Sequence, residues 1–196
     1  PSISTSSPAS QEGTGIFRLI AHVGRNFNLA TNSEFGVCGT IDLTAKGFQQ
    51  SQSPGNASHG GQGTGYWGGA GNKVYGKVKR VRTIGSSSSS GAGGGNLELH
   101  VAGEAAISGH IRANGGPDHT GNGSSRSGGG VWITAGSIFG SGDIIVRAEK
   151  PGGGGGAGGG RISVMLTTPG ATFDSFTGRM SAHDRPSRYN AGTIYT

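Results

Sequence analysis

Short stretches of alternating hydrophobic and polar residues recur along the chain, and glycine-rich runs separate them. In four of these stretches a marker glycine is followed, two positions later, by an apolar residue; the markers are Gly39, Gly109, Gly142 and Gly178. Period-two alternation with β-branched residues and bounding glycine is typical of β-strands. Glycine interrupts every stretch that could otherwise be helical. The pattern therefore predicts an all-β protein built from repeated units.

A second alternating stretch precedes the marker glycine in each unit, so the sequence predicts two short strands per unit. These stretches are Phe27/Leu29, Leu97/Leu99/Val101, Val131/Ile133 and Ile162/Val164/Leu166. An offset of 70 residues aligns the first two units and matches Leu29 with Leu99 and Val37 with Ile107.

The spacing of the marker glycines, 70, 33 and 36 residues, is too long for tight hairpins and too irregular for a barrel. Units that stack would pair equivalent strands in parallel and place like positions above one another. The expected inner ladders are Ile41, Ile111, Ile144 and Met180, and Val37, Ile107 and Phe176. Outside, Asp143 would lie over Arg179 and Asp42 over Arg112, as opposite charges favour. We predict a short right-handed parallel β-helix with glycine-rich excursions, with a β-sandwich as the alternative.

The same pattern predicts one glycine-rich β-repeat domain over 16–196, preceded by a flexible or partner-contacting arm over 1–15. The expected coils lie near 16–48, 96–115, 130–150 and 161–184, with an unfinished coil at 190–196. Glycine-rich insertions separate the coils at 49–95, 116–129 and 151–160.

Composition sharpens the interpretation of the glycine-rich runs. Glycine and proline contribute 43 and 7 of the 196 residues, hydrophobic residues 31% and charged residues 13%. Such a glycine content is typical of low-complexity chains, but a modest net charge of +6 and bursts of β-branched residues favour a thin ordered core. Ordering glycine is costly, whereas side-chain-free extended chains can lie very close together. We therefore expect the glycine-rich runs to pack against one another as a second layer.

The single cysteine and two asparagines are candidates for burial and for glycosylation, respectively. The single cysteine, Cys38, excludes an intrachain disulfide, and we expect it to fill the core as most free thiols do. Asn56 and Asn122 begin Asn-X-Ser triplets, which are candidate N-glycosylation sites although such triplets also arise by chance. No run approaches the ~18 apolar residues of a membrane span, so membrane insertion is not expected.

Several motifs in a fixed order carry a resemblance that covers residues 66–196. They are Gly65-Tyr-Trp-Gly-Gly, Val74-Tyr-Gly-Lys, Ile84-Gly followed by a serine run, Gly130-Val-Trp-Ile-Thr-Ala-Gly-Ser-Ile, Gly158-Gly-Gly-Arg-Ile-Ser-Val and Ala191-Gly-Thr-Ile-Tyr. This region resembles the glycine-rich repeats of large secreted and cell-surface proteins of bacteria and some protists. The resemblance implies an extracellular β-helix-like module of an adhesin, sheath or appendage, and it brings no catalytic residues with it.

Enzyme chemistry has little support in the sequence. The ten carboxylates are dispersed, and no pair has the context of a matched general acid and base. The six histidines do not recur at the spacing of metal ligands, and the many Gly-x-Gly-x-x-Gly matches lack the βαβ setting of a phosphate-binding loop. We expect no enzyme, no cofactor and no metal; a polysaccharide lyase is kept as a third reading by analogy of fold.

The best candidate binding patch is basic and aromatic. It consists of Tyr66, Trp67, Lys73, Tyr75, Lys77, Lys79, Arg80 and Arg82. Exposed lysines on a strand edge can simply discourage edge-to-edge pairing. Alternatively, the patch attracts an acidic polysaccharide through its charge. Nucleic acid is not an expected partner for a chain with an extracellular character.

The last residues, Gly192, Thr193, Ile194 and Tyr195, have the pattern of the first strand of a further coil and are the candidate assembly strand. Head-to-tail pairing of such ends generates open filaments. The sequence therefore predicts a non-enzymatic extracellular structural module that self-associates in a filament, sheath or appendage. A carbohydrate-binding adhesin domain is the alternative function.

Overall fold

The computed structural model describes residues 2–6, 17–32, 37–49, 57–63, 73–88, 91–117, 125–149, 156–183 and 191–196. Every regular element in these ranges is a β-strand, and the strands form three largely parallel sheets and one hairpin. The predicted all-β class with parallel pairing is thus confirmed. Among the same residues, no helix is long and apolar enough to cross a membrane.

The six-stranded sheet is the largest. Its order is β1 (Ser2–Ser6), β2 (Arg18–Val23), β7 (Asn96–Val101), β10 (Gly130–Ala135), β13 (Arg161–Leu166) and β15 (Thr193–Tyr195). All neighbours are parallel except β1, which pairs antiparallel with β2. Residues 2–6 of the expected N-terminal arm therefore form an edge strand of this sheet.

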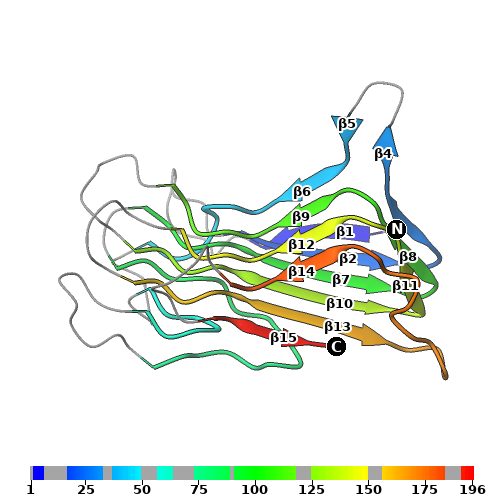
Figure 1. Ribbon diagram of the computed structural model, residues 1–196. Coiled ribbons are helices and arrows are strands. Elements are labelled where there is room, and N and C mark those ends of the chain that lie inside the picture. The colour runs from blue at the N-terminus through cyan, green and yellow to red at the C-terminus, as the bar shows by residue number, and fades with distance from the viewer. Residues whose placement is uncertain are drawn as a thin grey trace.

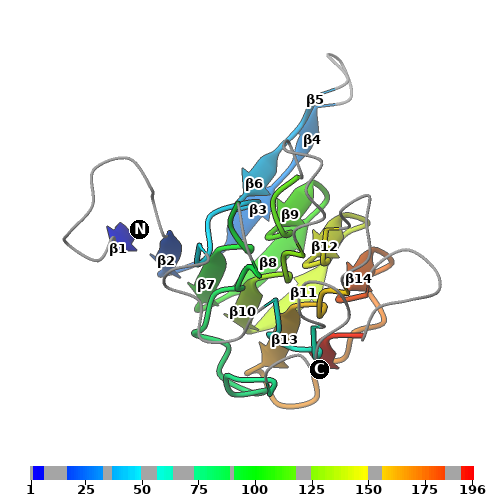
Figure 2. The same cartoon turned by 90° about the vertical axis from the view of Figure 1, so that its left-hand side faces the viewer.

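Two smaller parallel sheets complete the stack. The three-stranded sheet contains β3 (Phe27–Leu29), β8 (Glu104–Ile107) and β11 (Ser137–Phe139), and the four-stranded sheet contains β6 (Thr40–Asp42), β9 (His110–Arg112), β12 (Asp143–Ile145) and β14 (Arg179–Ser181). The chain passes through the six-, three- and four-stranded sheets in that order and then returns to the first; we call each pass a circuit (Figures 1 and 2). The fourth pass goes from β13 to β14 without a strand in the three-stranded sheet.

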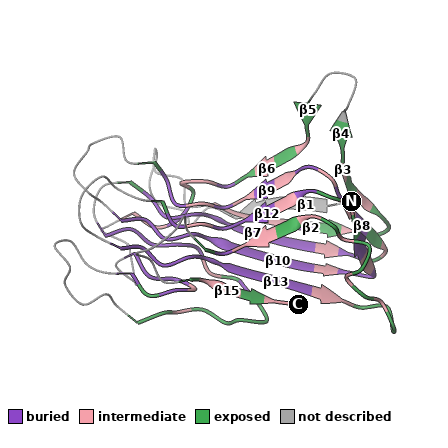
Figure 3. Cartoon of the chain, viewed as in Figure 1, coloured by how far each residue is buried: buried purple, intermediate pink, exposed green. Residues whose placement is uncertain are grey.

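The core lies between the sheets and consists of the inward positions of the strands. Ile41, Ile111, Ile144 and Met180 lie in register across the four-stranded sheet, as predicted. The central strands β7, β10 and β13 are the most buried, whereas β6 and β15 at the ends are more exposed (Figure 3). On the outside, Arg179 Nε forms an ion pair with Asp143 Oδ1 at 3.3 Å, and Asp42 lies opposite Arg112 in the next strand. The alternation of the sequence therefore specifies the inner and outer faces correctly.

The predicted register of the first unit is wrong upstream of Gly39. Leu29 lies beside Ile107, not Leu99, and it is Leu19 that lies beside Leu97. Each complete circuit also has three strands rather than two. The reason is a hairpin, β4 (Thr31–Asn32) and β5 (Val37–Cys38), which is inserted between β3 and β6 and lengthens the first circuit. An alignment through the marker glycines alone therefore misplaces everything before the hairpin.

The hairpin also explains why two residues expected in the core are outside it. Val37 is 60% exposed and Cys38 is exposed as well, so neither the predicted ladder of Val37, Ile107 and Phe176 nor the predicted burial of Cys38 is correct. The hairpin projects away from the stack (Figure 1), and its side chains have no opposing sheet to pack against.

The glycine-rich segments continue from the strands and lie side by side on the left in Figure 1. Their backbones are hydrogen-bonded to one another: Gly85 N–H donates to Gly94 O at 2.7 Å, and Gly94 N–H donates to Ser127 O at 3.1 Å. Farther along, Gly128 N–H donates to Gly158 O at 3.2 Å. We call the described glycine-rich segments around these bonds the glycine layer. For these described segments the hydrogen bonds and close approaches agree with the prediction that the runs pack against one another; the rest of each run lies outside the described residues.

Candidate functional site

An extended basic segment crosses the outer face of the six-stranded sheet. We call residues 73–84 the basic strap. Outward side chains of the sheet hold its backbone: Asn96 Nδ2 donates to Val81 O at 2.9 Å, Ser163 Oγ to Lys79 O at 2.9 Å and Arg161 Nε to Tyr75 O at 3.1 Å. These donors belong to two strands of the sheet, β7 and β13, so the sheet fixes the path of the strap.

The strap carries six of the predicted binding residues, five cations and Tyr75. Lys73, Lys77, Lys79, Arg80 and Arg82 are all exposed, and the strap contains no acidic residue. Lys79 Nζ lies 5.3 Å from the ring centroid of Tyr195, and the Arg82 guanidinium lies 5.2 Å from that of Trp132. The other predicted aromatic contacts, Tyr66 and Trp67, lie outside the described residues.

Tyr75 points inward and supports the strap. Its hydroxyl donates to Ile84 O at 2.6 Å, and its ring lies 5.1 Å from that of His59. Burial, the largest cause, raises the pKa of the Tyr75 hydroxyl above its ordinary value. The structure therefore places this ring under the strap rather than on the surface where a ligand would meet it.

A polar and aromatic cluster that no sequence motif predicts lies beneath the end of the strap. Glu98 is only 1% exposed, is ion-paired with Arg18, and has Arg82 Nε at 3.4 Å and His100 Nε2 at 3.8 Å. Since two arginines already surround this carboxylate, it does not neutralise the rest of the strap. The available signal was weak: Glu98 is an outward residue in an alternating strand.

His100 links this cluster to its neighbours. Its ring stacks on that of His22 at 4.9 Å and meets Trp132 edge-on at 4.7 Å. Burial lowers the pKa of His100, the nearby His22 lowers it further, and Glu98 opposes both effects. The two histidines also line a shallow groove of about 710 Å³ together with Thr134.

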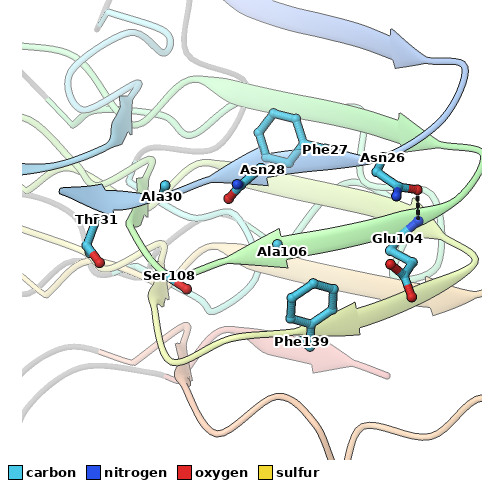
Figure 4. Close-up of a pocket in the computed structure, with 9 residues that line it drawn as sticks. All are labelled: Asn26, Phe27, Asn28, Ala30, Thr31, Glu104, Ala106, Ser108 and Phe139. Atoms are coloured by element: carbon cyan, nitrogen blue, oxygen red, sulfur yellow. Dashed lines mark hydrogen bonds between the residues drawn. The ribbon is translucent and has the colours of Figure 1, made fainter. Parts of the chain in front are cut away.

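A second groove, about 410 Å³ in volume, crosses the outer face of the three-stranded sheet (Figure 4). We call it the Phe139 groove; its lining residues are Asn26, Phe27, Asn28, Ala30, Thr31, Glu104, Ala106, Ser108 and Phe139. Phe139 is 39% exposed, and Asn26 Oδ1 accepts a hydrogen bond from Glu104 N–H at 3.0 Å. No local motif in the sequence predicts this groove, because its residues come from three circuits.

The candidate assembly strand is β15, at the end of the stack. Ile194 lies in register with Ile162, which is fully buried, yet Ile194 is 44% exposed. In the sheet order β15 is an edge strand, paired on one side by β13. Gly192 N–H donates to Ala182 O at 2.7 Å and Thr193 N–H to Gly160 O at 3.0 Å, so this strand is well anchored.

The remaining sequence predictions concern glycosylation and metal binding. Asn56 and Asn122 lie outside the described residues. Where the chain is described, no group of three or more His, Cys, Asp or Glu side chains is arranged to hold a metal. Comparisons of the chain with protein-family models, with curated proteins and with solved structures gave no match.

Proposed function

We propose that this chain is a non-enzymatic structural module whose circuits form a short parallel β-helix. It assembles by stacking circuit on circuit in an extracellular filament, sheath or appendage. The observation that carries the proposal is Ile194. It continues a ladder whose other members from β7, β10 and β13 are fully buried, yet a large part of its own surface is open.

An edge strand with an apolar inward residue favours addition of another strand. Among the described residues, β13 is the strand that pairs with β15, so the other side of β15 can pair with a further chain, and Ile194 would be buried when it does. The opposite edge of the same sheet is β1. Contact between the β15 edge of one copy and the β1 edge of the next is heterologous, and repeated contacts of that kind produce open filaments.

Ile194→Asp tests this assembly. In sedimentation velocity over a wide concentration range, the unmodified chain is expected to form concentration-dependent oligomers. Burying an isoleucine side chain contributes about 2 kcal/mol, so the variant should need at least about tenfold more protein to associate.

Val78→Asp is the matched control, because Val78 is also exposed but lies on the basic strap. It should associate as the unmodified chain does. A chain that stays monomeric at every concentration, or an Ile194→Asp variant that associates as readily as the control, would overturn the proposal.

A second candidate function is the binding of an acidic polysaccharide by the basic strap. It is favoured by the exposed cations of the strap, which has no acidic residue; of these cations Arg82, together with Arg18, pairs with the buried Glu98. A surface that carries only positive charges attracts a polyanion, and salt weakens the attraction.

Lys77→Glu is expected to lower the salt concentration at which the chain elutes from a column of sulfated polysaccharide. Arg25→Glu makes the same change in net charge at an exposed position away from the strap and should elute closer to the unmodified chain. Equal shifts for both variants would mean that net charge, rather than the strap, determines retention.

A further inference from the structure

We propose that the Phe139 groove binds a neutral oligosaccharide, with the exposed face of the Phe139 ring as the surface on which a sugar ring stacks. This site is separate from the basic strap and from the β15 edge. It would add a second, uncharged ligand class to the module, and it does not depend on the proposed assembly.

The register of the three-stranded sheet gives the groove its shape. Asn28, Ala106 and Phe139 occupy equivalent outward positions on β3, β8 and β11. Neighbouring strands are about 4.8 Å apart, so the outer two positions are separated by about 10 Å. The small side chain of Ala106 leaves a hollow between them, as Figure 4 shows. A flat ring can lie over Ala106 and against Phe139.

The polar groups around this hollow suit hydroxyl groups. Asn28 offers an amide, Thr31 and Ser108 offer hydroxyls, and Glu104 offers a carboxylate. Amides and hydroxyls can both donate and accept, as a sugar hydroxyl does, and the carboxylate accepts. An apolar surface with a few polar groups around it is the usual composition of a ligand site, and the volume of the groove falls within the range of about 300–1,000 Å³ for such sites.

The charge of the groove favours a neutral ligand. Glu104 is its charged lining residue, so an anionic sugar would be repelled from the position where its hydroxyls would bind. The hairpin adds a side wall, because Thr31 of β4 lines the groove and the hairpin rises from this end of the stack (Figure 1). The groove is therefore bounded on one side and open along its length, which suits a chain of sugar units.

Affinity electrophoresis of the 196-residue chain in gels containing soluble neutral glucan, mannan or galactan tests the proposal. At least one polymer should retard the chain, and Phe139→Ala should weaken that interaction by about tenfold. Val78→Ala removes an equally exposed apolar side chain from the basic strap and should migrate as the unmodified chain does.

Two further variants distinguish stacking from simple apolar contact and from misfolding. Phe139→Trp retains an aromatic face and should retain binding, whereas Phe139→Leu keeps an apolar side chain without a flat ring and should lose it. Retardation by none of the three polymers would overturn the proposal. So would binding by Phe139→Leu that equals binding by the unmodified chain. Neither result would bear on assembly, which Ile194→Asp reports separately.

Discussion

Replacing Gly129 with alanine is expected to lower the free energy of unfolding by about 3 kcal/mol or more, because a Cβ atom at this position overlaps backbone. It would collide with the carbonyl oxygen of Gly95 and lie 2.6 Å from the carbonyl carbon of Gly94. Those atoms cannot rotate away as a flexible side chain could. The bonds from Gly129 N–H to Ala113 O (2.7 Å) and from Gly130 N–H to Gly95 O (2.9 Å) hold both segments in place.

Gly24→Ala is the matched control for this substitution. A Cβ atom at Gly24 meets nothing within 4 Å, and the backbone there is not in the left-handed region. The control should change the free energy of unfolding by no more than about 0.5 kcal/mol in either direction. Urea denaturation followed by circular dichroism measures both variants. Similar midpoints for the two would contradict close packing of the glycine layer.

The folded chain is expected to lose up to about 3 kcal/mol of stability as the pH falls from 6.5 to 4, because His59 is buried in its neutral form. The pKa of His59 is lowered from 6.5 to about 4, chiefly by burial; Arg161 acts in the same direction, and hydrogen bonding to backbone carbonyls opposes both. Between these two values the unfolded chain binds the proton and the folded chain does not. The contribution of neutral His59 to stability is therefore fully present above pH 6.5 and is lost as the pH falls from 6.5 to 4.

The contacts of His59 identify the proton that it carries. Nδ1 lies 2.9 Å from Gly128 O, and because a carbonyl can only accept, Nδ1–H must donate to it. Neutral Nε2 then accepts from Thr83 Oγ1 at 2.8 Å. His59 thus joins the glycine layer to the basic strap, and protonating it would place a charge between them.

His59→Gln keeps a polar side chain but does not titrate, so it is the control for the pH effect. Its stability should vary much less between pH 6.5 and 4, even if it is lower throughout. The lowered pKa of His100 acts in the same direction in both proteins and therefore does not affect the comparison. Equal slopes of stability against pH for the two proteins would rule out a buried neutral His59.

Rigid packing of the glycine layer bears on the proposed structural role. In this layer the backbone itself fills the space that side chains usually fill, and hydrogen bonds link successive circuits. A module of this kind holds its two candidate surfaces, the basic strap and the Phe139 groove, on a fixed frame.

The alternation in the sequence determined which residues of a strand face inward, and the marker glycines determined the register of the four-stranded sheet. The inner ladder of this sheet illustrates both points. Each of its residues follows its marker glycine by two positions and lies beside the equivalent residue of the next strand; they are Ile41, Ile111, Ile144 and Met180. A period of two is local information, since successive side chains of a strand necessarily point to opposite faces. The close packing of the glycine runs could also be predicted. Ordering glycine costs conformational entropy, and glycine has no side chain to bury, so close backbone contacts are what can offset that cost.

Only the tertiary structure determined how the strands are distributed among the sheets and which outward residues are neighbours. The hairpin that carries Val37 and Cys38 shifts the first circuit, and nothing in the local alternation separates an inserted strand from a stacked one. The path of the strap across the six-stranded sheet brings Arg82 to Glu98, and pairing between circuits places Asn28 and Phe139 on either side of Ala106. Local alternation specifies the face of a strand, whereas its neighbours depend on the length of chain between strands and on packing across the whole stack.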